Sequence, residues 1–438
     1  MHYDVMVIGG GAAGMMAAGF AAKSGKRTIL IEKNPVLGKK LLITGKGRCN
    51  ITNYCDVHEL VENIPINGKF LINTFYQFNS YDTISFFSDL GLEVKIERGN
   101  RVFPASDKAK DVVQVLIKYI HKNKVEVLHT AVESVMKFGS LFAAKLINGE
   151  VVRAEKLIIA TGGKSYPGTG STGDGYKFAR EFGHKLTRFK PSLVPIEAKQ
   201  FVKPCEWSQT FTMVGEKHST IGEDSQKKPF ARSIRIPALK DLGLKNVKIR
   251  IIDRNSKIVY EDFGEMEFTN YGVTGPIILS ASSHLRKIED HILSIDLKPA
   301  LSEEKLDLRL QREFQNNSNK QFKTILKNLL PIKMIPVFNI LLNIPENKKG
   351  AEITKPERSN LLYLLKNFQI ELEKFRPIQE AIITSGGVNV KEIDPKTMES
   401  KLVPGLFFAG EILDCDAYTG GFNLQIAWST GFVAGNST

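Results

Sequence analysis

Three glycines and one acidic residue near the start of the chain have the types and spacing of a dinucleotide-binding site. Gly9, Gly11 and Gly14 form a Gly-x-Gly-x-x-Gly run, and Glu32 follows at the end of the next apolar stretch. Glycine permits a tight turn and a close approach of the backbone to a pyrophosphate, while a carboxylate in this place can accept both hydroxyls of an adenosine ribose. The pattern predicts a site for FAD or NAD and does not distinguish between them.

The elements that position these residues lie on both sides of the glycine run. Residues 5–8 and 28–31 form two short, continuously apolar strands, as a parallel sheet covered on both faces requires. Between them, Ala12 and Ala13 open a helix whose first N–H groups carry partial positive charge and can bind phosphate. This order of elements predicts a doubly wound α/β fold.

A second helix opened by glycine is predicted near the end of the chain. The apolar stretch 405–410 ends in Gly410-Glu411, and Gly420-Gly421 precedes a helical stretch that contains Phe422, Asn423 and Gln425. In flavoproteins with two dinucleotide folds, a comparable acid binds the ribityl chain of FAD. A helix N-terminus at this place stabilises the negative charge of a reduced flavin. These residues favour FAD.

The loop 38–53 combines basic side chains with glycines and small polar residues. The cationic side chains can bind a pyrophosphate or an anionic substrate; they are Lys39, Lys40, Lys46 and Arg48. The neutral residues can supply hydrogen bonds; they are Thr44, Gly45, Asn50 and Asn53. The glycine content is typical of a loop that approaches a ligand rather than of a solvated basic loop.

Composition limits the class of protein. The 438 residues exceed one hydrophobic core, no apolar run has the length of a membrane span, and four cysteines in so long a chain do not make a disulfide framework. We therefore expect a cytoplasmic protein without a membrane partner. The net charge of +13 comes mostly from dispersed lysines, which disfavours a nucleic-acid partner. The sequence contains no His-x-x-x-His spacing, so it predicts no metal site.

The pattern of elements predicts three parts. Residues 1–190 and 376–438 form the dinucleotide-binding domain, residues 191–300 an inserted β-barrel, and residues 301–375 an inserted helical domain. Within the first part we expect one helix over residues 72–90, a helix near 112–120, a small β-meander over 125–152 and a buried strand at 157–161.

Several stretches in the expected order resemble the BaiN/HI0933-like family of bacterial NAD(P)/FAD-dependent oxidoreductases, which includes aminoacetone oxidase-like flavoproteins. They are residues 38–53, 101–104, 160–167, 172–176, 191–195, 264–272, 397–401 and 410–421. The resemblance implies a glutathione-reductase-type FAD domain with the two insertions. Lys46 departs from a glycine that the family commonly has in the first loop.

We interpret the chain as a FAD-dependent oxidoreductase that moves a hydride between flavin N5 and a small organic substrate. NAD(P)H, as a transient reductant, or oxygen is the possible redox partner. The alternative is a flavoprotein that modifies or binds tRNA. Non-covalent FAD is expected to contact Gly9, Gly11, Ala12, Ala13, Gly14, Glu32, Lys33, Lys39, Lys40, Thr44, Gly45, Gly47, Asn50, Val132, Thr161, Gly162, Gly163, Gly410, Glu411, Gly420, Gly421, Phe422, Asn423 and Gln425. The catalytic candidates are Tyr418, Lys46, Arg48 and Asn53.

Two further patterns are weaker. Residues 168–173 repeat the Gly-x-Gly-x-x-Gly spacing, but no ribose acid follows on schedule, so we expect a turn rather than an NAD(P) site. Cys49 and Cys55 are one residue too far apart for a disulfide-reductase pair, and free thiols are expected.

Overall fold

The structure is a computed structural model that describes residues 2–199, 201–202, 234–285 and 287–438. The chain forms two compact units: Met1–Val194 with Pro377–Thr438, and Pro195–Arg376. Cys205 lies outside the described residues. No helix among the described residues is long and apolar enough to cross a membrane.

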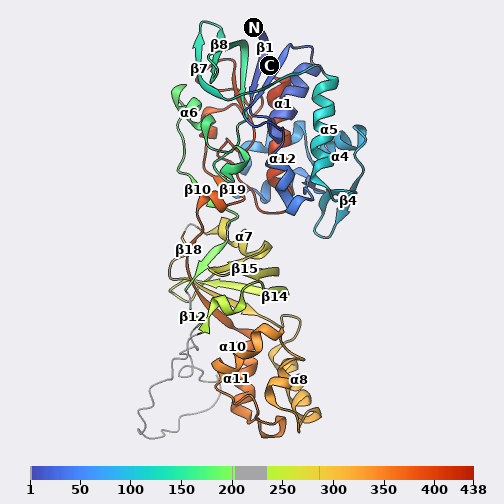
Figure 1. The fold of residues 1–438 in the computed structure, drawn as a ribbon, viewed down its shortest axis with the longest axis vertical. Coiled ribbons are helices and arrows are strands. Elements are labelled where there is room, and N and C mark those ends of the chain that lie inside the picture. Colours follow the sequence, from blue (N-terminus) through green and yellow to red (C-terminus); the bar gives the residue numbers. More distant parts are fainter. Residues whose placement is uncertain (1, 200, 203–233, 286) are drawn as a thin grey trace. The chain divides into compact units, whose positions relative to one another are not determined.

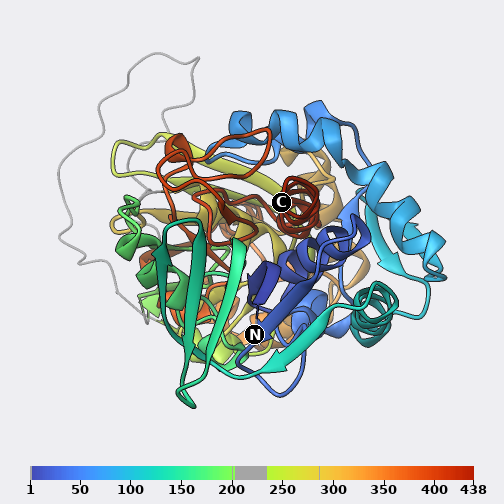
Figure 2. The ribbon, with the colours of Figure 1, turned by 90° about the horizontal axis from the view of Figure 1, so that it is seen from above.

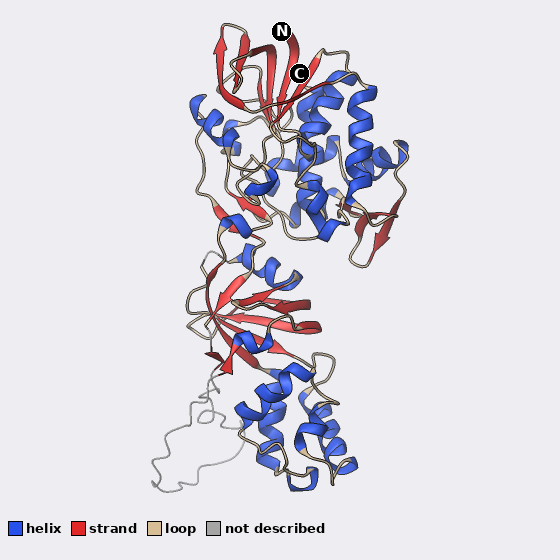
Figure 3. Cartoon of the chain, viewed as in Figure 1, coloured by secondary structure: helices blue, strands red, loops and turns tan. Residues whose placement is uncertain are grey.

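The first unit contains the predicted parallel sheet (Figure 3). Strands β1 (His2–Ile8), β2 (Thr28–Glu32), β6 (Glu126–His129), β9 (Val151–Ile159) and β20 (Leu406–Phe408) are parallel, and β7 (Val132–Phe138) and β8 (Leu141–Leu146) continue the sheet in antiparallel pairing. The order is β6-β2-β1-β9-β8-β7, with β20 also pairing β9. The Rossmann-type α/β fold is confirmed.

Helices from the two ends of the chain pack together against this sheet. Helix α1 (Ala12–Lys23) packs against α12 (Phe422–Asn436) and α5 (Ala109–Lys122) (Figures 1 and 2). The approach of α1 and α12 is close because a side chain at Gly431 would lie 2.5 Å from the carbonyl oxygen of Ala13. The C-terminal segment thus rejoins the first domain, as the apolar strand 405–410 predicted.

Smaller elements complete the first unit: α2 (Val57–Glu62), α3 (Ile72–Gln77), α4 (Ser80–Asp89), α6 (Asp174–Glu181), a three-stranded sheet of β3 (Thr52–Asn53), β5 (Arg101–Pro104) and β4 (Val94–Glu97), and the pair β10 (Lys190–Ser192) and β19 (Ile383–Ser385). The single helix predicted over 72–90 is two helices, because the Asn79 side chain caps a new N-terminus. The strand predicted at 157–161 belongs to the longer β9.

The second unit holds a closed barrel of β11 (Ile196–Ala198), β16 (Gly272–Thr274), β15 (Ile258–Phe268), β14 (Gly243–Ile252), β17 (Ile292–Asp296) and β18 (Phe368–Phe375). Strand β18 lies in the stretch that we expected to be helical; its alternate burial of Phe368, Ile370 and Leu372 has the period of a strand. Strands β12 (Phe201–Val202) and β13 (Ile234–Arg235) form a separate two-stranded sheet.

The helices of the second unit are α7 (Pro276–His284), α8 (Glu303–Asn316), α9 (Phe322–Leu326), α10 (Ile335–Leu342) and α11 (Lys355–Lys366). Their apolar faces and the barrel interior form one continuous hydrophobic core, to which Phe268 and Phe368 of the barrel and Phe338 of α10 belong. The barrel and the helices are therefore packed as one body.

Candidate functional site

The first glycine run forms an open cradle at the N-terminus of α1. Gly9 has φ 107°, and a side chain on Gly14 would collide with the Gly9 carbonyl, so both are fixed by the turn itself. A side chain on Gly11 would meet no protein atom within 4 Å. No side chain caps α1, and no acid stands in its first turn, so its N–H groups are available to phosphate.

Glu32 ends β2 beside this cradle and is held in a fixed position. Its carboxylate accepts hydrogen bonds from the Gly10 N–H at 2.6 Å and from the Asn34 backbone N–H at 2.8 Å. The Asn34 side chain donates a third bond at 2.6 Å. The side chain is 8% exposed. A carboxylate fixed by three donors is pre-oriented for a ribose.

The neighbouring Lys33 is turned away toward the second glycine run. It pairs with Asp174 at 2.6 Å and also donates to Thr172. Asn34 donates to the Thr169 carbonyl at 3.1 Å. Residues 168–173 therefore pack onto the segment after β2, as a turn that leads into α6.

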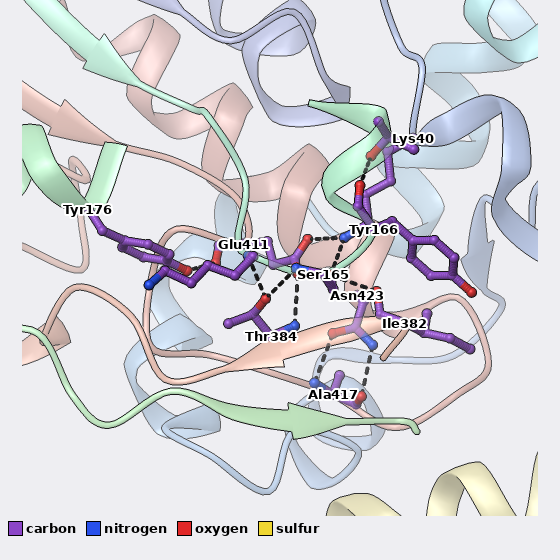
Figure 4. A network of polar contacts seen from close by, with 11 residues as sticks. Lys40, Ser165, Tyr166, Tyr176, Ile382, Thr384, Glu411, Ala417 and Asn423 are labelled. Carbon is purple, nitrogen blue, oxygen red and sulfur yellow. Dashed lines mark hydrogen bonds and ion pairs between the residues drawn. The ribbon is translucent and has the colours of Figure 1, made fainter. Parts of the chain in front are cut away.

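Lys40 and Glu411 form the centre of a polar network (Figure 4). Their charged groups are 2.6 Å apart, and Lys40 also donates to the Ser165 hydroxyl at 2.7 Å. The other oxygen of Glu411 accepts from Ser165 at 2.9 Å and from the Thr384 N–H at 2.9 Å. Gly163 must lack a side chain because one would strike Thr384 and Glu411. The acid expected to bind the ribityl chain thus joins three separate segments.

The Arg48 side chain also forms ion pairs within the protein. Its guanidinium pairs with Glu97 and Asp107, each at 2.5 Å, and lies 4.2 Å from the ring centroid of Phe103. Lys95 shares Asp107 at 2.6 Å. These bonds raise the pKa of Arg48, chiefly through Glu97. The contacts favour a structural role in holding the first loop to β4 and β5.

The rest of the loop 38–53 makes fewer contacts with other parts of the protein. Lys39 is half-buried and Lys46 exposed, and neither has a hydrogen bond or ion pair within the described part of the chain. Thr44 donates to the Leu41 carbonyl at 2.7 Å. Gly45 and Gly47 have positive φ, and so does Lys46 at 58°, where a side chain is strained.

The N-terminus of α12 is the second cradle. Gly420 and Gly421 have φ 132° and 103°, and no side chain caps the helix. Phe422 is buried. The Asn423 amide pairs with both backbone groups of Ala417, at 2.9 and 2.8 Å, and so fixes the preceding loop (Figure 4).

Gln425 lies one turn further along α12 and is fully buried. Its oxygen accepts from Thr52 at 2.6 Å and from Thr83 at 2.9 Å, and its nitrogen donates to Ser429 at 2.8 Å and to the Phe78 carbonyl at 3.3 Å. Because both its oxygen and its nitrogen form hydrogen bonds with the protein, this side chain ties α12 to β3 and α4.

Several buried polar atoms have no partner within the described residues. Three of them belong to predicted site residues: Oδ1 of Asn50, Oδ1 of Asn53 and Oγ1 of Thr161; the others are on Tyr119, Asn339 and Asp416. Asn50 and Thr161 were expected to contact FAD, and Asn53 was a catalytic candidate. A buried polar group without a partner is costly. Together with the open Gly11 cradle and the uncapped starts of α1 and α12, these atoms fit FAD: α1 and Glu32 would hold its adenosine diphosphate, and α12 its flavin.

The remaining residues expected to contact FAD lie at several places in the first unit. Ala13 is buried, and a side chain at Gly410 would lie 2.8 Å from it. Gly162 has φ 75° beside Ser171. Val132 opens β7, half-buried. Ala12 is the first residue of α1.

In the sequence, Tyr418 lies between the buried acid Asp416 and the glycine pair Gly420-Gly421 that precedes α12. Its backbone is held by the Asn63 carbonyl at 3.0 Å and by Asn423 at 3.3 Å. Burial and then Asp416 raise the pKa of Tyr418. Asp416 is 2% exposed, one oxygen accepts from Ser192 at 2.8 Å, and burial raises its pKa to about 6. Sequence reasoning missed Asp416, Ser165, Asn34 and Thr384; only Asn34, beside Glu32, carried a local signal.

The thiols and histidines that the structure describes form no second functional centre. Cys49 and Cys55 are free and buried, and burial raises the pKa of each to about 12, so both stay protonated. Buried His184 contacts Glu392 at 3.1 Å and Ser400 at 2.8 Å. Ser400 accepts from two backbone N–H groups, which suits a structural link. No group of residues that could hold a metal occurs in the described ranges.

Comparison with known proteins identifies the family. The model of the HI0933-like protein Rossmann domain matches residues 3–437. A 3-dehydro-bile acid delta(4,6)-reductase of Clostridium scindens is 29% identical over 440 residues and 98% of each chain. A ribosomal RNA dihydrouridine synthase of Escherichia coli is 29% identical over 99% of this chain and 97% of its own.

Among solved structures, the 3-ketosteroid-delta4-(5alpha)-dehydrogenase of Rhodococcus jostii superposes with a TM-score of 0.50 at 14% identity, over 100% of this chain and 96% of that one. This likeness shows that the two chains share a fold. The chain belongs to the HI0933-like family of FAD-dependent oxidoreductases.

Proposed function

We propose that this protein is a FAD-dependent reductase of carbon–carbon double bonds conjugated to a carbonyl. The names of the two full-length relatives support this. A delta(4,6)-reductase of a 3-dehydro bile acid and a dihydrouridine synthase both saturate a double bond in conjugation with a carbonyl. The bound flavin supplies the hydride in such a reaction.

The observation that carries the proposal is the geometry before α12. Asn423 and the Asn63 carbonyl fix the backbone of Tyr418 immediately before Gly420 and Gly421. Since its raised pKa keeps the phenol protonated, Tyr418 can give the proton that the substrate carbon adjacent to the carbonyl needs after hydride addition. The hydride and this proton together account for both hydrogens added to the bond.

Different roles are proposed for the other three catalytic candidates. Asn53, with its unpartnered oxygen, is proposed to orient the flavin or substrate. Lys46 is proposed to attract anionic substrates, because its ammonium is exposed. Arg48 is not proposed to be catalytic because Glu97 and Asp107 neutralise it.

The test uses the FAD-loaded protein, reduced without oxygen and mixed with 2-cyclohexenone. We expect saturated product and reoxidised flavin. Tyr418→Phe should slow this reoxidation about 100-fold, within the usual contribution of a general acid, and leave reoxidation by oxygen unchanged. Tyr76→Phe is the matched control, since Tyr76 is 74% exposed. No product with the unmodified protein, or equal rates in both variants, would refute the assignment.

A second candidate substrate is a uracil base in RNA. The name of the Escherichia coli relative favours it and points to ribosomal RNA rather than to the tRNA of the sequence-based alternative. NAD(P)H is proposed as a transient reductant, because the second glycine run is engaged by Lys33 and Asn34.

A further inference from the structure

Two tyrosines and two arginines form an exposed surface beside the second cradle. Tyr54 is 44% and Tyr81 43% exposed, with ring centroids 5.1 Å apart and planes at 88°. Arg98 and Arg101 are exposed on the hairpin between β4 and β5. The Tyr54 N–H donates to the Asn100 carbonyl at 2.7 Å, which joins the tyrosines to the hairpin. We call these four residues the Tyr-Arg rim.

Asn53 connects the Tyr-Arg rim to the flavin end of the site. Its amide nitrogen donates to the Gly99 carbonyl and to the Gly420 carbonyl, each at 3.1 Å. Asn53 also pairs with Arg101 in the β3–β5 ladder. The hairpin tip and the start of α12 therefore lie within the reach of one side chain. The other amide atom of Asn53 is buried without a partner in the described structure, and the residue is 4% exposed.

The charge of the Tyr-Arg rim is not neutralised. Neither Arg98 nor Arg101 pairs with a carboxylate within the described residues, whereas Arg48 nearby has two such partners. The Arg101 guanidinium donates to the Arg98 carbonyl at 3.0 Å and lies 5.9 Å from the ring centroid of Phe103, which leaves its charge without a counter-ion in the described structure. Asp56 and Glu59 lie on the tyrosine side, where they act on Tyr81. Glu97, opposite Arg101 in the β4–β5 pair, is already bound by Arg48 and Lys95. Phosphate therefore suits the arginine side, and an uncharged base suits the tyrosine side.

We propose that the Tyr-Arg rim binds single-stranded RNA and presents one unstacked base to the flavin. Exposed aromatic rings bind bases through their faces, and free arginines bind the phosphates between them. The site begins at Asn53, where the strand would pass from the rim to the cradle of α12. This inference rests on the proposed function for the reaction but concerns binding, so the two can fail separately.

The experiment measures binding of fluorescein-labelled decauridine to the FAD-loaded protein by anisotropy at several salt concentrations. The double variant R98E/R101E should bind at least tenfold more weakly. It should also show a shallower dependence on salt, since two phosphate contacts are removed. The control R153E/R312E makes the same change of charge at two exposed arginines elsewhere and should change affinity less than twofold.

A second pair of variants tests stacking. Tyr54→Leu should lose about tenfold in affinity, whereas Tyr54→Phe should retain it, because the aromatic face does the binding. All variants should keep their flavin spectrum and reduce cyclohexenone normally. Equal losses in the two arginine double variants, or equal binding by the Leu and Phe variants, would overturn the proposal. Failure of cyclohexenone reduction in every protein, with RNA binding as expected, would refute the proposed function alone.

Discussion

At the start of α1, a methyl group added to Gly11 would meet no protein atom within 4 Å, whereas at the start of α12 one added to Gly421 would lie 2.5 Å from the backbone of Thr52. Gly11 has φ −84°, open to any residue, while Gly421 has φ 103°. The first glycine leaves room for a ligand, and the second is required by the protein's own packing. A glycine motif therefore does not by itself show what its glycines are for.

The difference extends to the side chains around each helix start. Glu32, at the α1 end, is held by Gly10 and Asn34 beside an open cradle. At the α12 end, Asn423 and Gln425 are bonded to the protein. We therefore expect mutations at the α12 end to change stability and those at the α1 end to change cofactor affinity.

The largest effect is expected for Gly421→Ala. The added methyl group would strike Thr52, and the alanine would have to keep a positive φ. We therefore expect a loss of about 4 kcal/mol in unfolding free energy and little bound flavin. Denaturant unfolding and flavin absorbance measure both. Gly243→Ala is the control, because nothing lies within 4 Å of its added methyl. A stable, yellow Gly421→Ala protein would contradict the packing argument.

Gln425→Ala should lower the unfolding free energy by about 3 kcal/mol, since it removes four hydrogen bonds from the core and leaves the Thr52 hydroxyl without its partner there. Flavin that remains bound should keep its reduction potential. A shifted potential with unchanged stability would mean that Gln425 touches the cofactor, as the sequence predicts.

Glu32→Ala should weaken FAD binding by roughly ten- to hundredfold, or about 2 kcal/mol, and leave the protein folded. Titration of the apoprotein with FAD measures this. Glu150→Ala, an exposed acid, should bind FAD normally. An unchanged titration for Glu32→Ala would remove it from the cofactor site.

Asp416→Asn should stabilise the protein in a pH-dependent way. Burial raises the pKa of this acid to about 6 from 3.8, so its ionisation opposes folding as pH rises from about 4 to 6. The variant should gain about 3 kcal/mol at pH 8 and little near pH 4. A pH-independent difference in thermal unfolding would contradict this.

The smallest effect is expected for Lys46→Gly. Lys46 has φ 58°, a conformation that costs a side chain about 1 kcal/mol, so glycine should stabilise the fold slightly. If Lys46 attracts anionic substrates, the same variant raises the KM for an anionic enone and leaves that for cyclohexenone unchanged. Equal KM changes for both substrates would exclude the electrostatic role.

The sequence predicted the α1 end well because its signal is local: Gly9, Gly11 and Glu32 are joined by one turn and one helix. At the other end it identified Gly420 and Gly421, but not what surrounds them. Glu411 meets Lys40, and Gln425 meets Thr52, across hundreds of residues of chain. Such partners depend on tertiary packing and leave no periodic signal. Whether Glu411 also contacts the cofactor stays a prediction.

The return of the chain to its first unit also sets an order for biosynthesis. Strand β20 and helix α12 complete the sheet and the packing of α1, yet they are translated after the whole of Pro195–Arg376. The second unit can fold on the ribosome while the N-terminal strands still lack their last partner, since domains fold as units during synthesis. On the proposal that the start of α12 holds the flavin, stable capture of FAD would have to follow translation of Gly421, and cofactor loading would be a late event in the maturation of this protein.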